Sequence, residues 1–214
     1  MQPKMINVVG AGSLGSFSVL LLSKMSQVFG CAIRVLDFDN VEQHNTRNQL
    51  YRETDTGRPK VEALAEIIQI TCGVDLIVEN KKVDSSTDLR DIVIVLVDKM
   101  DVRRSIFESC RYNASVNYFI EARTGENQAL VYAFDPKDSY WVGRYEAFLY
   151  DDSESQNQPC ATPESVPTLW TVATVIARLV TRYKNQAVFT NEFYQAIIDL
   201  SDWPSLVSEA FLDI

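Results

Sequence analysis

A glycine-rich turn near the start of the chain is the first group of residues with an evident chemical use. Positions 8–15 read Val-Val-Gly-Ala-Gly-Ser-Leu-Gly and overlap an apolar run at positions 5–9 that predicts a buried strand. In this pattern Gly10 permits a tight turn, Gly12 lets the backbone approach a phosphate, and Gly15 lets the next helix pack closely on the sheet. The motif predicts a nucleotide site, although a glycine motif alone is a weak signal.

The helix predicted at positions 14–27 would begin directly at this turn. Its first backbone N–H groups would face an anion, and the helix dipole favours negative charge there. We therefore count Ser13 and Leu14 among the nucleotide-binding residues, together with the three glycines.

A second strand, predicted at positions 32–36, ends in Asp37, 22 residues beyond Gly15. A carboxylate at this place can accept hydrogen bonds from ribose hydroxyls. Asp39 follows two residues later, and both aspartates have an alternative role as turn-forming residues. Up to this point NAD and ATP fit equally well.

Amides and cations are gathered after the second strand. Positions 40–50 read Asn-Val-Glu-Gln-His-Asn-Thr-Arg-Asn-Gln-Leu, and Gly-Arg-Pro-Lys at positions 57–60 opens a predicted helix. A hydride-transfer enzyme has no use for such a group. An enzyme that cleaves ATP between its α- and β-phosphates needs one, because the charge on the leaving pyrophosphate must be stabilised. These residues therefore favour ATP.

Taken together, these segments resemble the ThiF/MoeB-like family of ubiquitin-activating enzymes. Its members show Asp-x-Asp-x-Val, then Ser-Asn-Leu-x-Arg-Gln, then Gly-x-Pro-Lys. The resemblance implies that Lys60 contacts the phosphates of ATP and that the amides of Asn45 and Gln49 line the triphosphate site. In isolation Lys60 would be read as a solvated helix residue. His44 stands where the family more often has serine, and we interpret it as a capping or surface residue.

The sequence departs from the family at two arginines. Asn48, which we also count as nucleotide-binding, occupies the slot of the arginine before the glutamine, and Arg47 is displaced by one residue. Such a shift turns a helical side chain by about 100°, so we expect Arg52 or Arg58 to supply the guanidinium instead. Dimeric relatives carry a second arginine ahead of the first strand. Here we expect another chain to provide it, or catalysis to be slow or absent.

Asp101 is the candidate metal ligand and a candidate catalytic residue. It follows an apolar strand predicted at positions 91–97, at the edge where open α/β sheets bind ligands. Positions 97–104 resemble the family segment Asp-x-x-Asp-Asn-x-x-x-Arg, whose second aspartate helps to position Mg²⁺, although Val102 replaces the asparagine. Mg²⁺ needs only one or two carboxylates beside phosphate oxygens. The alternative is that Asp101 is the N-cap of a helix beginning at Val102.

Cys160 is the third candidate catalytic residue. It lies between a polar stretch at 151–159 and a long apolar helix predicted at 168–183. Some relatives place a nucleophilic cysteine in this crossover loop, but a lone cysteine is often a small buried hydrophobe. Three further cysteines are interpreted as packing residues, and no Cys-x-x-Cys pair is present for the zinc knot of many relatives. They are Cys31, Cys72 and Cys110.

Alternating strands and helices predict a Rossmann-like α/β fold, with a doubly wound, mostly parallel sheet. We expect an antiparallel extension at one edge, from strands at 128–134 and 140–144. The 214 residues fit a single nucleotide-binding domain, with a crossover loop at 151–167 and a helical C-terminal part at 168–214 that includes a helical tail from 191.

Composition limits the partners. A net charge of −9 and a pI near 4.7 argue against nucleic acid and anionic membranes. The sequence has neither an apolar run of membrane-spanning length nor a signal-peptide pattern, so we expect a cytoplasmic protein.

The function expected from the resemblance is ATP-dependent adenylylation of a C-terminal carboxylate, with Mg²⁺. The partner would be a small ubiquitin-like or sulfur-carrier protein ending in Gly-Gly, and the enzyme would be a homodimer or heterodimer. Two alternatives stay open: a catalytically inactive nucleotide-binding partner subunit, and an NAD(P)-dependent oxidoreductase.

Overall fold

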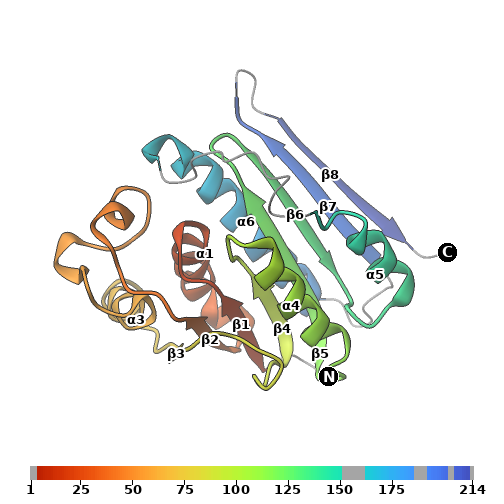
Figure 1. The fold of residues 1–214 in the computed structure, drawn as a ribbon, viewed down its shortest axis with the longest axis horizontal. Helices are drawn as coiled ribbons and strands as arrows, with labels where there is room; N and C mark the ends of the chain where they lie inside the picture. Colours follow the sequence, from red (N-terminus) through yellow and green to blue (C-terminus); the bar gives the residue numbers. More distant parts are fainter. Residues whose placement is uncertain (1–3, 151–161, 186–191, 202–204, 213–214) are drawn as a thin grey trace.

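A computed structural model describes residues 4–150, 162–185, 192–201 and 205–212 (Figure 1). Its centre is an eight-stranded sheet in the order β3-β2-β1-β4-β5-β6-β7-β8. The first five strands are parallel to one another, and the last three are added antiparallel. The strands are β1 (Met5–Val9), β2 (Ala32–Asp37), β3 (Ile77–Asn80), β4 (Asp91–Val95), β5 (Val116–Thr124), β6 (Gln128–Phe134), β7 (Glu192–Asp199) and β8 (Ser205–Leu212).

Helices cover both faces of the sheet. On one face α1, α3 and α6 share an apolar core with the strands, and on the other face α4 and α5 do so (Figure 1). The α-helices are α1 (Ser13–Lys24), α2 (Ser26–Phe29), α3 (Lys60–Cys72), α4 (Met100–Arg111), α5 (Ser139–Glu146) and α6 (Val166–Asn185). Short 3₁₀ turns are η1 (Gln43–Arg47), η2 (Glu53–Asp55) and η4 (Pro163–Ser165). The expected Rossmann-like, mostly parallel fold with an antiparallel extension is confirmed.

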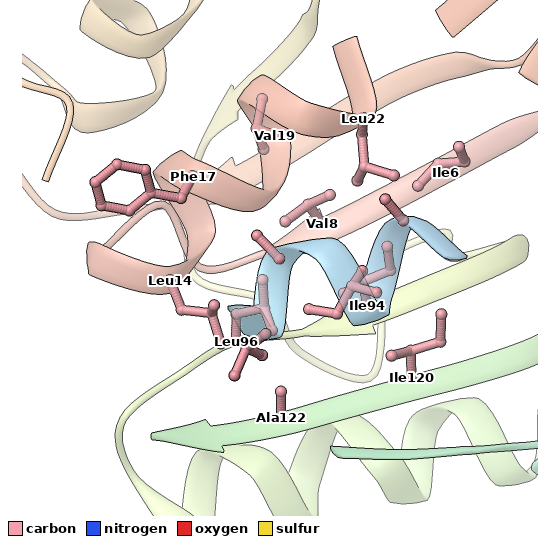
Figure 2. Close-up of a cluster of buried hydrophobic side chains, with 14 of the residues drawn as sticks. Ile6, Val8, Leu14, Phe17, Val19, Leu22, Ile94, Leu96, Ile120 and Ala122 are labelled. Atoms are coloured by element: carbon pink, nitrogen blue, oxygen red, sulfur yellow. The ribbon is translucent and has the colours of Figure 1, made fainter. Parts of the chain in front are cut away.

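The apolar character of β1, β4 and α1 follows from their central position. Strands covered on both faces read as continuous apolar runs, as in the Asp-Ile-Val-Ile-Val of β4. Figure 2 shows side chains of α1 in one apolar cluster with residues of β1, β4 and β5, while α6 (blue) lies beside α1 over β5. This packing fixes the turn between β1 and α1 at the carboxyl edge of the sheet. The α1 residues drawn there are Leu14, Phe17, Val19 and Leu22, and the strand residues of the same cluster include Ile6, Val8, Ile94 and Ile120.

Two predicted elements were wrong. Residues 140–144, expected as an antiparallel strand, lie in helix α5. The carboxylate of Asp138 caps that helix by accepting hydrogen bonds from the backbone N–H groups of Tyr140 (3.0 Å) and Trp141 (3.4 Å). Trp141 and Tyr145 are four residues apart and bury the same side of α5 against the sheet.

The expected helical tail from residue 191 was also wrong. Residues 192–199 form β7, which pairs with β6 on one side and β8 on the other. The C-terminal part is therefore helical only in its first segment, α6. Pairing with distant strands overrides local preference here, because Glu-Phe-Tyr-Gln-Ala-Ile-Ile-Asp fits a helix as readily as a strand. None of the helices in the described part of the chain has the length and apolar character needed to span a bilayer.

Candidate functional site

The turn between β1 and α1 needs glycine at two positions for different reasons. Gly10 has a φ of +101°, and a Cβ there would lie 2.6 Å from the carbonyl oxygen of Leu96. A Cβ on Gly15 would lie 2.0 Å from the carbonyl oxygen of Gly10, so a side chain would push α1 off the turn. A Cβ on Gly12 would meet nothing within 4 Å, which leaves open space directly over the backbone.

The first backbone N–H groups of α1 have no acceptor within the helix itself. Gly12 is the N-cap residue, and no side chain among the described residues caps the first turn. The side chain of Leu14 is buried in the core, so Leu14 can contribute only its backbone N–H to a ligand. An uncapped helix start of this kind suits an anion such as a phosphate.

Asp37, at the end of β2, holds the turn in place. Its Oδ2 accepts a hydrogen bond from the backbone N–H of Ala11 (2.6 Å), and its Oδ1 accepts one from the N–H of Asp39 (2.8 Å). Burial raises the pKa of the Asp37 carboxyl, and these two N–H groups partly oppose that effect. Each carboxylate oxygen has two lone pairs, so hydrogen bonds to a ribose stay possible and stay a prediction.

Lys60 is brought to the same edge by a short backbone ladder. The N–H of Val41 donates to the carbonyl of Arg58 (2.8 Å), and the N–H of Lys60 donates to the carbonyl of Asp39 (2.9 Å). The ladder closes the loop of residues 42–56, so α3 starts beside the carboxyl end of β2. Pro59 is the N-cap residue of α3, and Lys60 is its first helical residue.

The side chain of Lys60 is buried and paired. Its Nζ lies 3.1 Å from Oδ2 of Asp39, and the two side chains are 10% and 52% exposed. The alternative of a solvated helix residue, which Lys60 in isolation would suggest, is therefore wrong. A fixed ammonium group now stands at the carboxyl edge that also carries the glycine turn, where it can stabilise negative charge on a ligand.

The amide residues of the 43–50 segment have structural partners. Asn45 is buried, and its Oδ1 accepts a hydrogen bond from the backbone N–H of Glu42 (2.8 Å). Asn48 is buried, and its Nδ2 lies 3.3 Å from Oγ of Ser165 in η4. Gln49 has a buried side-chain oxygen without a hydrogen-bond partner in the described part of the chain. Contact of these amides with a triphosphate stays a prediction.

Arg52 and Arg58 contact other residues than a ligand. Both guanidinium groups lie within 3.0 Å of Oδ1 of Asp55, and both pair with Glu66 at 2.8 and 2.9 Å. Asp55 is fully buried, and the hydrogen bond from Arg52 lowers its pKa. In this arrangement neither arginine is free to replace the guanidinium that the resemblance implies; Arg47 is exposed.

Asp101 lies in the first turn of α4, at the same edge of the sheet. The helix begins at Met100 with Lys99 as its N-cap residue, so the alternative role of Asp101 as the N-cap was wrong. Its exposed side chain lines a surface groove of about 840 Å³ along α4. No cluster of three or more potential metal ligands occurs within the described ranges, so a metal here would need oxygen atoms from a ligand.

The structure also places the histidine and three of the four cysteines singled out in the sequence. His44 is exposed and lies 3.4 Å from Glu42, as expected of a surface residue. Cys110 is buried, and Cys31 and Cys72 are partly buried against the core. Cys160 falls outside the described residues.

The family model for ThiF matches residues 3–204. The chain belongs to the ThiF family. No curated protein matches it significantly. Among solved structures it is similar to PaaA, with 18% identity and a TM-score of 0.65 over 99% of this chain and 65% of that one. It is also similar to E. coli MccB solved with MccA, with 15% identity, a TM-score of 0.70, and coverage of 99% and 64%.

Another structure of E. coli MccB, solved with ATP, has 15% identity, a TM-score of 0.67, and coverage of 99% and 64%. This ThiF-family chain spans just under two thirds of the length of these proteins. At such identities the likeness shows the fold.

Sequence reasoning missed two contacts near the site of this ThiF-family chain. The hydroxyl of Tyr51 donates a hydrogen bond to the carbonyl of Ala11 (2.6 Å). Glu121, within β5, forms a buried ion pair with Arg103 of α4. Glu121 was visible in the sequence as a charge within an apolar strand, whereas nothing local distinguished Tyr51.

Proposed function

We propose that this protein is an ATP-dependent adenylyltransferase that activates the carboxylate of a small peptide or protein. The observation that carries the proposal is the buried ammonium group of Lys60, fixed beside Asp39 at the edge that holds the uncapped start of α1. A cation and a set of free N–H groups at one edge suit a polyphosphate. The structure of MccB with ATP, on the same fold, supports this choice of nucleotide.

The proposed step is a displacement at the α-phosphorus of ATP. An oxygen of the substrate carboxylate forms a bond to that phosphorus, the bond from the phosphorus to the oxygen bridging to the β-phosphate breaks, and pyrophosphate leaves. The products are an acyl-adenylate and pyrophosphate. Lys60 and the N–H groups of residues 12–15 stabilise the phosphate charge, and Asp37 orients the ribose. Catalysis then rests on positioning and charge stabilisation.

Exposed carboxylates that could hold Mg²⁺ follow the carboxyl ends of β2 and β4. Asp39 and Asp101 both have exposed side chains there, and Mg²⁺ is held by one or two carboxylates together with phosphate oxygens. We propose Asp101 as the protein ligand. When bound, the ion neutralises phosphate charge, and Lys60 acts on the same charge from the protein side.

For the substrate we propose a small ubiquitin-like or sulfur-carrier protein that ends in Gly-Gly. A structure of E. coli MccB with AMPCPP and MccA supports a protein or peptide partner of this general kind. We further propose that the chain works as a homodimer or heterodimer, which would allow a second subunit to contribute the guanidinium that Arg52 and Arg58 do not offer.

A second candidate function is a catalytically inactive nucleotide-binding subunit. The engagement of Arg52 and Arg58 with Asp55 and Glu66 favours it, because the family's arginine then has no replacement from this loop. The buried Lys60 argues against an NAD(P)-dependent oxidoreductase, because hydride transfer does not need a cation at this place.

Two measurements test these alternatives. ATP with Mg²⁺ should raise the melting temperature, and NADH should not, because a ligand stabilises only the state that it binds. With a Gly-Gly carrier present, the protein should exchange labelled pyrophosphate into ATP. Binding of ATP without exchange for any carrier would establish the inactive subunit, and stabilisation by NADH alone would establish the oxidoreductase.

A further inference from the structure

Ala11, in the middle of the glycine-rich turn, has both of its backbone polar groups taken by side chains from other segments. Its N–H donates to Oδ2 of Asp37 at 2.6 Å, and its carbonyl accepts the hydroxyl hydrogen of Tyr51 at 2.6 Å. The two contacts fix the peptide units on either side of Ala11. The N–H groups of Gly12 and Ser13, which follow, thereby acquire a set direction.

We propose that Tyr51 is a positioning residue for phosphate binding, which acts by holding the carbonyl of Ala11 and so the whole glycine-rich turn. This inference rests on the proposed function, because it assigns Tyr51 to the phosphates of the bound nucleotide. Tyr51 contacts the turn, so in this proposal it acts on the phosphates only through the turn.

The surroundings of Tyr51 suit this role. Its side chain is only 3% exposed and belongs to the same apolar core as α1 and β1, so the ring cannot turn away. Burial, reinforced by the nearby carboxylates of Asp37, Asp55 and Asp39, raises the pKa of its hydroxyl far above the ordinary value. This shift favours the protonated hydroxyl, which is the form that donates to the Ala11 carbonyl.

A second contact ties the same segment to α1. The backbone N–H of Leu50 lies 3.4 Å from Oγ of Ser16, in the first turn of that helix. Leu50 and Tyr51 thus support α1 and the turn at two points, and the ladder that follows them holds Lys60 beside the carboxyl end of β2. Preorganised donors of this kind bind an anion without having to be ordered at the moment of binding.

Tyr51→Phe tests the proposal, because it removes the hydroxyl and keeps the ring. We expect the Kd for ATP, measured by titration calorimetry, to rise about tenfold, the scale of one lost hydrogen bond with an unsatisfied carbonyl left behind. The Kd for adenosine, measured by NMR titration, should stay the same, because adenosine has no phosphate. Tyr145→Phe is the matched control: it removes a buried tyrosine hydroxyl that bonds Glu121 at 3.2 Å, and it should leave both constants unchanged.

Hydrogen exchange gives an independent readout. In Tyr51→Phe the amides of residues 11–15 should exchange about tenfold faster, whereas the amides of β4 keep their wild-type protection. An unchanged Kd for ATP, or an equal loss for ATP and adenosine, would overturn the positioning role and leave the proposed function standing. Failure of the wild-type protein to bind ATP at all would remove both.

Discussion

Lys60 Nζ and Asp39 Oδ2 lie 3.1 Å apart, although 21 positions separate the two residues in the chain. The contact depends on the ladder between residues 39–41 and 57–60, which also includes a bridge between Asn40 and Pro59. Lys60 is therefore held at the carboxyl edge of the sheet by backbone hydrogen bonds that do not require a ligand. A cation fixed in advance is more effective at stabilising developing charge than one that must be ordered during the reaction.

Substitutions at Gly12 and Gly15 should differ in their effects on stability and on ATP binding. Gly12→Ala meets no atom within 4 Å, so the free energy of unfolding should change by less than about 1 kcal/mol. The added methyl group would nevertheless occupy the open space over the turn, and the Kd for ATP should rise by more than about tenfold. Urea unfolding and titration calorimetry measure the two effects.

Gly15→Ala is the contrasting variant. Its Cβ would lie 2.0 Å from the carbonyl oxygen of Gly10, and the protein should lose about 2 kcal/mol of stability or more. If Gly12→Ala bound ATP like the wild type, the open space over Gly12 would not be where the phosphates bind.

Asp55 should make stability depend on pH. The hydrogen bond from Arg52 lowers the pKa of the Asp55 carboxyl in the folded state. The ionised carboxylate therefore adds to the free energy of unfolding above the unfolded pKa of about 3.9, and this stabilisation is lost as the pH falls through the folded pKa. Asp55→Asn should therefore destabilise the protein at pH 7, with a smaller difference from wild type at pH 3. Urea unfolding at both pH values checks this; a difference that grows towards low pH would refute the assignment.

Glu121 should be important for stability because its charge is buried. Glu121→Ala removes the carboxylate that pairs with both Arg103 and Arg123, and it should cost about 3–5 kcal/mol in the free energy of unfolding. The control is Glu146→Ala, which removes a partly exposed partner of Arg111 at 2.6 Å and should cost less than about 1 kcal/mol. If both variants lost the same free energy of unfolding in denaturant titrations, the buried pair would be no more important for stability than the exposed one.

A substitution at Cys160 distinguishes adenylation of the carrier from its later transfer to a thiol. Adenylation needs no thiol, so Cys160→Ser should keep nearly all of the pyrophosphate exchange. If Cys160 is a nucleophile, the wild type should form a thiol-cleavable adduct with the carrier, visible by intact-protein mass spectrometry, and the variant should not. The same adduct in both proteins, or none in either, would make Cys160 a packing residue.

The sequence predicted the parallel half of the fold well, because each of its elements carries its own signal. Local features marked these elements: the apolar run of β1, the glycines of the turn and the proline before α3. The observed elements lie within a few residues of the predicted ones. The antiparallel half was harder. Residues 192–199 become a strand through pairing with β6 and β8, and no local feature of the sequence announces these partners.

The site residues also divide into those with a local sequence signal and those that depend on distant contacts. Lys60 and the glycines could be selected from the sequence because motif and spacing mark them. The role of Tyr51 could not, because it consists of one hydrogen bond to a residue 40 positions away. The two arginines of the 42–58 loop were expected at a ligand and instead neutralise Asp55 and Glu66, since a buried carboxylate needs a cation nearby.

Pyrophosphate exchange by Lys60→Ala is the most direct test of the proposed activity. With a Gly-Gly carrier that supports exchange by the wild type, Lys60→Ala should lower the exchange rate by about two orders of magnitude or more, the scale for losing one charge contact in a transition state. Lys24→Ala, which removes an exposed lysine whose Nζ donates to the carbonyl of Thr71 at 2.7 Å, should exchange at the wild-type rate. Wild-type exchange by Lys60→Ala would contradict the account.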